Sequence, residues 1–195
     1  AFDREIYCAE IRSGDCTPTL TWVPEGVPGY IPFEKYGFDP EAAVAALAES
    51  SYGGPEGLPP ITMAYNSDLS GNNERAEFVA GQYRDILGVE ITLEPTDGTT
   101  LIALRKDPTT HPQMLLVGGW IQDYPDPQNW LSVFWTCDST FAQRVGYCNE
   151  EFDELTAQGD TTVDQAERVA FYEQAGEVLA EDIPGPFLYN QSGTF

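Results

Sequence analysis

The chain has 195 residues, of which 42% are hydrophobic and 12% aromatic, and its formal net charge at pH 7 is −23. Such a chain can bury a core, so disorder is not expected. No apolar run approaches the roughly 20 residues that cross a bilayer, which excludes a transmembrane segment here. With 32 acidic and 9 basic side chains the sequence offers no basic patch, so nucleic acid is excluded as an expected partner and anionic membrane surfaces are disfavoured.

Four cysteines are present, Cys8, Cys16, Cys137 and Cys148, and they form no CxxC pair. A structural zinc site commonly uses closely spaced Cys and His pairs, so no metal site is expected. Two disulfides are the better interpretation, and they indicate an oxidising compartment outside the cytoplasm. Of the three possible pairings, Cys8–Cys16 with Cys137–Cys148 closes the two shortest loops. The alternative is four free, buried thiols in a cytosolic protein.

The first half of the chain alternates extended and helical patterns. The first residues are typical of a helix already under way, and residues 16–38 form an extended segment rich in proline, glycine and aromatic residues. Asp39 and Pro40 predict the start of a helix, which Gly53-Gly54 ends. The elements predicted next are a strand at 61–65, a helix capped by Asn72 or Asn73 and ended by Gly88, a strand at 89–93, a short helix at 99–105, and a strand at 113–117 buried on both faces. Strand–helix–strand predicts a right-handed parallel unit.

The second half is mainly helical. Its predicted elements are a short helix at 128–134, a loop between the last two cysteines, a helix at 149–157, a long helix at 162–182 with Val163, Ala166, Val169, Ala170, Val178 and Leu179 on its inner side, and a last strand at 187–189. Together the two halves predict an α/β fold with a largely parallel sheet and no internal repeat.

The densest group of candidate functional residues directly follows the predicted strand at 113–117. Open α/β sheets bind ligands beyond the carboxyl ends of their strands. Gly118 and Gly119 let a ligand approach the backbone, and Trp120 offers a flat apolar wall. Asp123 lies in a proline-stiffened loop beside this tryptophan, and a carboxylate next to an aromatic ring suits an ammonium group.

Two other interpretations of this loop remain open. In the first it is only a rigid turn, with Trp120 and Trp130 in the core and both Asp123 and Asp126 as turn caps. In the second the two aspartates are the carboxylate pair of an extracytoplasmic glycoside hydrolase domain. The second has little support, because the sequence has no nucleophile elbow, P-loop or dinucleotide motif, and His111 lies in a proline-flanked loop. No catalytic residue, metal or cofactor is expected.

Several motifs, in a fixed order, carry a family resemblance. They are Ala-Phe-Asp-Arg-Glu at 1–5, Val-Pro-x-Gly-x-Pro-Gly-Tyr at 23–30, Tyr-Gly-Phe-Asp-Pro-Glu-Ala-Ala at 36–43, Gly-Trp-x-x-Asp-Tyr-Pro-Asp-Pro at 119–127, Arg168-x-x-x-Tyr172-x-x-Ala175, and Ile183-Pro184 before a strand. Together they resemble the family 5 extracellular solute-binding proteins, the dipeptide- and oligopeptide-binding receptors of ABC importers. The resemblance covers essentially the whole chain and implies a type II periplasmic-binding-protein-like lobe.

The resemblance also implies an organisation and a function. Residues 1–195 would be a single domain, the second, inserted lobe of a two-lobed protein, with residues 1–38 as the extended segment by which the chain enters it. Ala1 and Phe195 would then lie near each other. The implied function is solute recognition for import, without catalysis. The implied partners are a small solute, the first lobe and a membrane permease, in the periplasm or at the cell surface, with a lipid anchor as one option.

The resemblance assigns roles to individual residues. The candidate ligand-binding residues are Gly118, Gly119, Trp120, Ile121, Asp123 and Tyr124. Asp123 stands where peptide-binding members hold the α-ammonium of the peptide. The pair Cys137 and Cys148 matches a disulfide of dipeptide-binding relatives, whereas Cys8 and Cys16 have no counterpart in many members. Members with the same motif also bind oligosaccharides, nickel complexes or other solutes, so peptide is the leading ligand and oligosaccharide the alternative.

Overall fold

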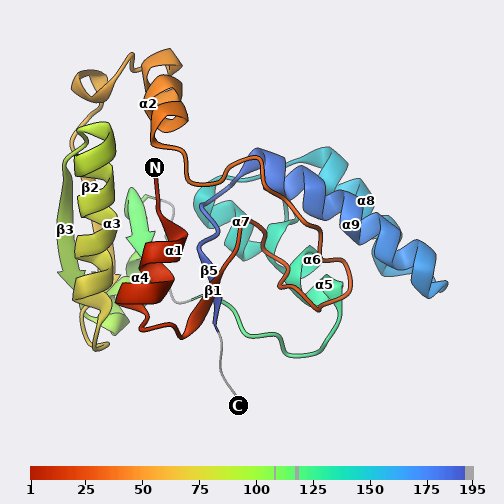
Figure 1. Ribbon diagram of the computed structural model, residues 1–195. Helices are drawn as coiled ribbons and strands as arrows, with labels where there is room; N and C mark the ends of the chain where they lie inside the picture. The colour runs from red at the N-terminus through yellow and green to blue at the C-terminus, as the bar shows by residue number, and fades with distance from the viewer. Residues whose placement is uncertain (108, 117–118, 192–195) are drawn as a thin grey trace. The chain divides into compact units, whose positions relative to one another are not determined.

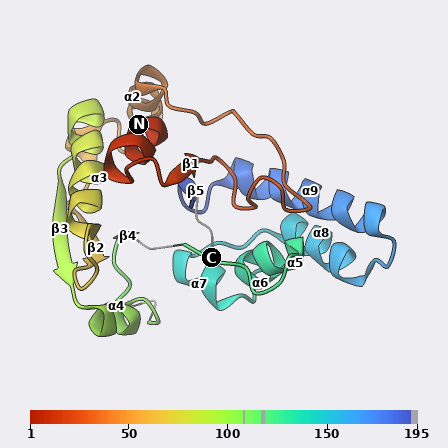
Figure 2. The ribbon, with the colours of Figure 1, turned by 60° about the horizontal axis from the view of Figure 1, so that its bottom comes forward.

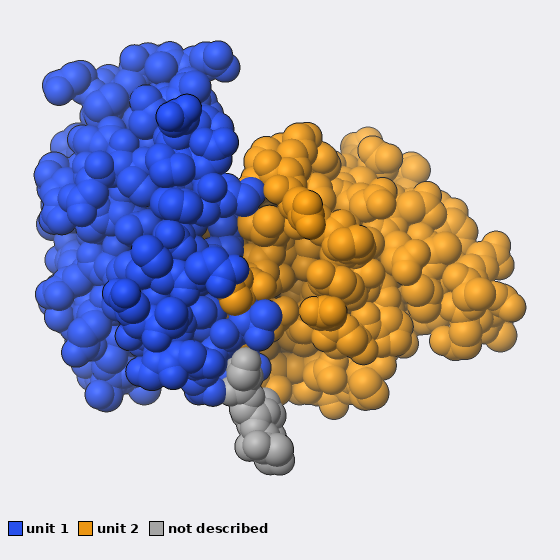
Figure 3. All heavy atoms as spheres, viewed as in Figure 1, with its two compact units in different colours: residues 1–17, 37–119, 191–195 blue, residues 18–36, 120–190 orange. Residues whose placement is uncertain are grey.

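The structure is a computed structural model that describes residues 1–107, 109–116 and 119–191 (Figure 1). The described residues divide into two compact units, coloured separately in Figure 3. Unit 1 is drawn from 1–17, 37–119 and 191–195, and unit 2 comprises 18–36 and 120–190. Each unit is built from two or more separate stretches of sequence, and the chain passes from unit 1 to unit 2 between Gly119 and Trp120.

Unit 1 contains a three-stranded parallel sheet in the order β3-β2-β4. The strands are β2 (Ile61–Asn66), β3 (Ile91–Thr96) and β4 (Met114–Leu116), and α3 (Asn72–Leu87) connects β2 to β3. The central strand buries Met63, Ala64 and Tyr65 almost completely. The helix packs beside this strand in Figures 1 and 2. The predicted parallel strand–helix–strand unit is therefore confirmed, whereas β4, at the other side of β2, is only half-buried.

The start of α2 follows the predicted capping, and α4, for which no cap was predicted, begins in the same way. Asp39 Oδ1 accepts a hydrogen bond from the Ala42 amide at 2.9 Å at the start of α2 (Pro40–Glu49). Asp97 does the same for Thr100 at 3.0 Å at the start of α4 (Gly98–Leu104). However, α2 ends before the predicted glycines, and none of its residues is buried. A short helical turn, η2 (Pro55–Gly57), follows it.

The predicted cap of α3 is wrong. The helix begins after Gly71, whose φ of 80° places it in the left-handed region, and no side chain caps it. Asn72 instead donates its amide to the Asn66 carbonyl at 2.9 Å. Asn73 accepts a hydrogen bond from the Tyr65 hydroxyl at 2.7 Å. Both asparagines connect the helix to β2, and this use of their side chains was not visible in the sequence pattern.

The beginning of the chain is a helix with its own cap. Asp3 Oδ1 accepts from the Ile6 amide at 3.0 Å, so α1 (Arg4–Ile6) starts within the chain rather than being already under way. It continues into η1 (Tyr7–Ile11), a turn of π-helix. The chain then enters β1 (Cys16–Pro18), which pairs with β5 (Tyr189–Gln191) in a two-stranded sheet. The last strand thus begins two residues later than predicted, and the expectation about Phe195 lies outside the described residues.

Unit 2 is built around large aromatic side chains. Trp22, from the extended segment, has its ring within 6 Å of four others, at centroid distances of 5.9, 5.2, 5.5 and 5.8 Å. These rings belong to Trp130, Phe134, Trp135 and Phe187. The Trp22 indole also donates to the Trp130 carbonyl at 2.7 Å. The packing of Trp22 agrees with a segment held by aromatic residues, but the segment turns at 24–27 and again at 27–30 rather than running extended throughout.

Five helices surround this core. They are α5 (Pro127–Trp130), α6 (Ser132–Trp135), α7 (Thr140–Val145), α8 (Glu150–Thr161) and α9 (Gln165–Asp182). The first two replace the single predicted helix, because the chain leaves regular helical geometry at the fully buried Leu131. The last two lie side by side in both ribbon views (Figures 1 and 2).

The inner face of α9 is partly mispredicted. Its buried residues are Tyr172, Ala175, Gly176, Leu179 and Ala180. Leu179 was predicted correctly, but Val163 lies before the helix at 89% exposure, and Ala166 and Ala170 are exposed. The reason is that alanine is tolerated on either face of a helix, so alanines alone do not fix the phase of the pattern.

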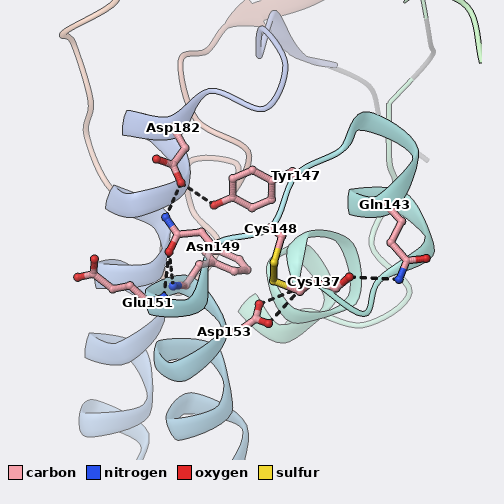
Figure 4. The surroundings of a disulfide bond; sticks show 9 residues. Cys137, Gln143, Tyr147, Cys148, Asn149, Glu151, Asp153 and Asp182 are labelled. Carbon is pink, nitrogen blue, oxygen red and sulfur yellow. Dashed lines mark hydrogen bonds between the residues drawn. A yellow bond between two sulfur atoms is a disulfide. The ribbon is translucent and has the colours of Figure 1, made fainter. Parts of the chain in front are cut away.

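Both predicted disulfides are present. Cys8–Cys16 joins η1 to β1 with a Cα–Cα distance of 5.3 Å, and Cys137–Cys148 lies in unit 2 at 4.5 Å. Figure 4 shows how the second is fastened: Asp153 of α8 accepts from the Cys137 amide at 3.0 Å. Tyr147, just before Cys148, donates its hydroxyl to Asp182 of α9 at 2.9 Å. The cysteine loop is thus connected to both long helices.

Among the described residues, no helix combines the length and apolar character needed to span a membrane. In the same part of the chain, no three His, Cys, Asp or Glu side chains come together as metal ligands would.

Candidate functional site

The candidate residues lie in the loop between β4 and α5. Gly118 is outside the described residues, so its predicted role is not addressed. Gly119 is exposed, with φ at 98°, a conformation that favours glycine, and a Cβ added there would have no atom within 4 Å. We call residues 119–124 the ligand loop. From Trp120 onward this loop belongs to unit 2.

A buried amide in α5 organises the ligand loop. Asn129 is 2% exposed, and its Oδ1 accepts two hydrogen bonds, from Trp120 Nε1 and from the Asp123 backbone amide, both at 3.0 Å. A further bond, from Trp130 Nε1 to Gln122 Oε1 at 3.0 Å, holds the middle of the loop. The backbone around Asp123 is therefore fixed by side chains of the following helix.

Trp120 is half-buried and is only partly the exposed wall that the sequence predicted. Its ring packs edge-on against Phe134, with centroids 4.7 Å apart, and lies 6.5 Å from Phe141. Phe134 and Phe141 stack on each other at 4.2 Å. One part of the indole thus belongs to the aromatic core of unit 2, which agrees in part with the structural interpretation of this turn.

Asp126 is committed to the fold. Its Oδ1 accepts from the Gln128 amide at 2.9 Å and caps α5, and the same oxygen pairs with Arg168 Nη2 of α9 at 2.9 Å. Arg168 in turn donates to the Gly159 carbonyl at 2.5 Å and lies over the ring of Tyr172. A capping, ion-paired carboxylate is not free for proton transfer to a substrate. The arrangement therefore does not favour the glycoside-hydrolase interpretation.

Asp123 differs from Asp126 in its side chain. Its backbone is held by Asn129, but its exposed carboxylate has no hydrogen-bond or ion-pair partner among the described residues. Its neighbours Ile121 and Tyr124 are 64% and 41% exposed, and the Tyr124 hydroxyl donates to Gln128 at 2.8 Å. The ligand loop thus presents one uncommitted anion on a fixed backbone, beside exposed apolar side chains. Such a group can accept hydrogen bonds from an ammonium or from hydroxyls.

Sequence reasoning found the loop but missed Asn129 and Arg168 as its supports. A signal was present for the first: two tryptophans near the loop need acceptors for their indole N–H groups when buried, and an asparagine stands between them. Arg168 was noted only as part of a motif. Its partner Asp126 lies 42 positions away in the sequence, and no local pattern connects the two.

Comparison with known proteins places this chain in a family. The family model described as bacterial extracellular solute-binding proteins, family 5, middle, matches residues 1–142. The chain belongs to this family. This match confirms the family 5 resemblance. The solved structures described next confirm the α/β fold of type II periplasmic-binding-protein kind. The two disulfides are confirmed by the structure itself.

Individual family 5 relatives cover the whole chain. The oligopeptide-binding protein OppA of Bacillus subtilis is 25% identical over 205 residues, covering 100% of this chain and 36% of that protein. The crystal structure of a periplasmic oligopeptide-binding protein from Borrelia burgdorferi matches with a TM-score of 0.84 at 28% identity, covering 96% of this chain and 37% of that one. A peptide-binding protein of a peptide ABC transporter, 21% identical, shares the fold with a TM-score of 0.79 and covers 98% of this chain and 87% of its own.

Two facts follow for this family 5 chain. It spans a little over a third of the length of the B. subtilis and B. burgdorferi proteins it matches. The family is one of solute-binding proteins for transport, and its members here are named for binding peptides rather than for an enzymatic activity.

Proposed function

We propose that this chain is one lobe of an extracytoplasmic receptor that recognises peptides for import by an ABC transporter. The observation that carries the proposal is the Asp123 carboxylate, uncommitted and exposed on a backbone held at 3.0 Å by the buried Asn129. Its role is to accept the α-ammonium of a peptide. Gly119, Trp120, Ile121 and Tyr124 line the ligand beside it, and the family resemblance assigns the same role to Gly118, which lies outside the described residues.

Charge supports a cationic group as the ligand of this loop. Unit 2 has sixteen acidic residues and three basic ones, counted over 18–36 and 120–190. Each of the three is engaged: Arg168 with Asp126, Lys35 with Glu181, and Arg144 over the ring of Phe141. Each basic side chain in the described part of unit 2 thus already has a partner within the unit, which disfavours binding of an anionic group of the ligand there. A peptide carboxylate is held by the other lobe.

The partners follow from the family. The peptide-binding relatives are much longer than this chain, which supports residues 1–195 as a single inserted lobe, entered through residues 1–38 and closing over the ligand with a first lobe. The closed form is what a membrane permease receives. The two disulfides and the extracellular family support a location in the periplasm or at the cell surface. No cofactor, metal or nucleic acid takes part.

Exchange of the carboxylate at Asp123 for an amide tests the proposal. In the receptor that contains this chain, a peptide such as trialanine at about 100 times its dissociation constant adds about 2.7 kcal/mol to stability, visible as a thermal shift. Asp123→Asn removes this shift and leaves the melting temperature of the unliganded protein unchanged. Asp138→Asn is the matched control, since it changes the net charge equally at another exposed aspartate of unit 2. It keeps the shift.

The ligand class is decided by two further probes. N-acetylated trialanine lacks the ammonium and gives no shift if Asp123 binds that group. Binding of both peptides alike, or binding that survives Asp123→Asn, contradicts the proposed contact. A shift with oligosaccharides and none with peptides replaces the peptide by the alternative ligand of this family. These 195 residues on their own bind far more weakly than the receptor, because a single lobe buries too little of a ligand.

A further inference from the structure

We propose that Asn129 is the positioning residue of the ligand loop: its side-chain oxygen fixes where the Asp123 carboxylate stands. This inference rests on the proposed function, in which that carboxylate takes the amine of a peptide. Asn129 itself is 2% exposed and does not reach solvent. It acts through its two neighbours in the loop and not on the ligand.

The geometry is that of one acceptor shared by two donors. Trp120 Nε1 and the Asp123 amide each lie 3.0 Å from the same Oδ1. A carbonyl oxygen has two lone pairs, so both bonds are made at once and the acceptor is saturated. Trp120 and Asp123 are therefore both held by one buried oxygen atom. A shift of either donor breaks a bond to an acceptor that is itself buried.

The acceptor itself is firmly placed. The backbone N–H of Asn129 donates to the backbone carbonyl of Asp126 at 3.1 Å in the first turn of α5. The Asp126 side chain caps that turn and pairs with Arg168 of α9 at 2.9 Å. A continuous path of hydrogen bonds therefore runs from the long helix α9 through the start of α5 to Asp123. This path explains why a loop with an exposed tip has a defined backbone.

A fixed backbone increases affinity because the loop need not be ordered when the ligand binds. Substitution of Asn129 by leucine, which has a similar size, leaves two partly buried N–H groups without their acceptor. The loop then samples other conformations, and binding must restore the productive one. We expect Asn129→Leu to weaken the binding of trialanine by about tenfold or more. Asn129→Asp keeps an acceptor oxygen in either protonation state and recovers most of the affinity.

The control is a buried polar residue that does not touch the loop. Thr156 is 1% exposed and bonds only within α8, through Oγ1 to the carbonyls of Phe152 and Asp153 at 3.0 Å. Thr156→Val disturbs the core of unit 2 without altering the ligand loop. The full receptor and each variant are compared in trialanine affinity, in thermal midpoint, and in hydrogen exchange of the Asp123 amide. Asn129→Ala, which removes the oxygen with less steric change, is used if the leucine variant does not fold.

The expected result is specific. Asn129→Leu loses affinity and accelerates exchange at Asp123, Asn129→Asp reverses both, and Thr156→Val changes neither, even where it lowers the midpoint as much. The inference is overturned if Thr156→Val loses as much affinity as Asn129→Leu, if the aspartate variant binds no better than the leucine variant, or if Asn129→Leu leaves both readouts unchanged. If the unaltered receptor binds no peptide, the proposed function fails. Exchange at Asp123 then still decides whether Asn129 fixes the loop.

Discussion

Unit 1 and unit 2 bury their cores in different ways. In unit 1 three successive residues of one strand, Met63, Ala64 and Tyr65, are 2%, 1% and 4% exposed, and a neighbouring helix and parallel strands cover them. In unit 2 the core is assembled from rings far apart in the sequence, such as Trp22 and Trp130, whose centroids are 5.9 Å apart. The first core is built from strands and a helix that follow one another in the sequence. The second core depends on a few contacts between residues far apart in the sequence.

This difference explains where the candidate site is found. The ligand loop, from Trp120 on, belongs to unit 2 and is held by hydrogen bonds from buried side chains of α5. Site geometry in this chain is thus a property of unit 2, and changes inside unit 1 should leave it intact.

The largest expected effect tests whether the two cores are independent. Phe152→Ala empties a fully buried position in unit 2 and costs about 3–5 kcal/mol, because the removed ring leaves a cavity. Hydrogen exchange should then rise in α8 and α9 and remain slow in β2. Met63→Ala, at 2% exposure in unit 1, costs about 2–5 kcal/mol and should produce the reverse pattern. Exchange that rises in both units with either variant contradicts the comparison and indicates one cooperative unit.

A smaller effect separates a rigid neighbour from a yielding one. A Cβ at Gly159 of α8 would lie 2.9 Å from Cζ of Tyr172, whose ring is fully buried and cannot move aside. Gly159→Ala therefore costs about 1–3 kcal/mol by overpacking, less the roughly 1 kcal/mol that alanine gains in a helix. A Cβ at Gly98 of unit 1 meets the Asn66 side-chain amide at the same distance. This side chain is half-buried and can move aside at the cost of the hydrogen bond that its Oδ1 accepts from the Asp68 amide.

Denaturant titration of both glycine variants compares the two cases. We expect Gly159→Ala to lower the free energy of unfolding more than Gly98→Ala. Equal costs, or a larger cost at Gly98, would show that the aromatic core of unit 2 adapts as easily as a surface side chain. In that case the aromatic core of unit 2 is no more rigid than the surroundings of Gly98 in unit 1.

The sequence predicted some features of each unit. In unit 1 the Asp39 cap and the parallel connection are local patterns and are present in the structure, whereas the predicted side-chain cap of α3 is not. The misplaced inner face of α9 and the division of one helix at Leu131 are both in unit 2. There the contacts between distant rings override the local pattern. A short window of the sequence does not contain both partners of such a contact.

The candidate site shows the same limit. The position of Asp123 in the loop after β4 is local information, and the rule for open α/β sheets was enough to select this loop as a candidate site. The difference between Asp123 and Asp126 could not be predicted. It arises from Arg168, which is contributed by a helix beyond the second disulfide and pairs with only one of the two carboxylates. The sequence shows which residues carry a carboxylate. The fold decides which of these carboxylates is free to contact a ligand.

The smallest effect concerns alkaline pH and again belongs to unit 2. Burial first, and then the hydrogen bond of its hydroxyl to Asp160, raise the pKa of Tyr172 well above its usual value. The tyrosine of the unfolded chain ionises near pH 10 while the native one stays protonated, so the free energy of unfolding falls as the pH rises above about 10. Below that pH both states hold the proton and the group contributes no pH dependence.

Tyr172→Phe therefore flattens the decline in stability between about pH 9 and pH 11, while it lowers stability at neutral pH by removing the bond to Asp160. Tyr52→Phe, at a 51% exposed position of unit 1, serves as the control and leaves the slope unchanged. Urea titrations at a series of pH values measure both variants. A slope that Tyr172→Phe does not alter would mean that the ring at the centre of unit 2 becomes accessible before the unit unfolds, and that this core is less rigid than its packing implies.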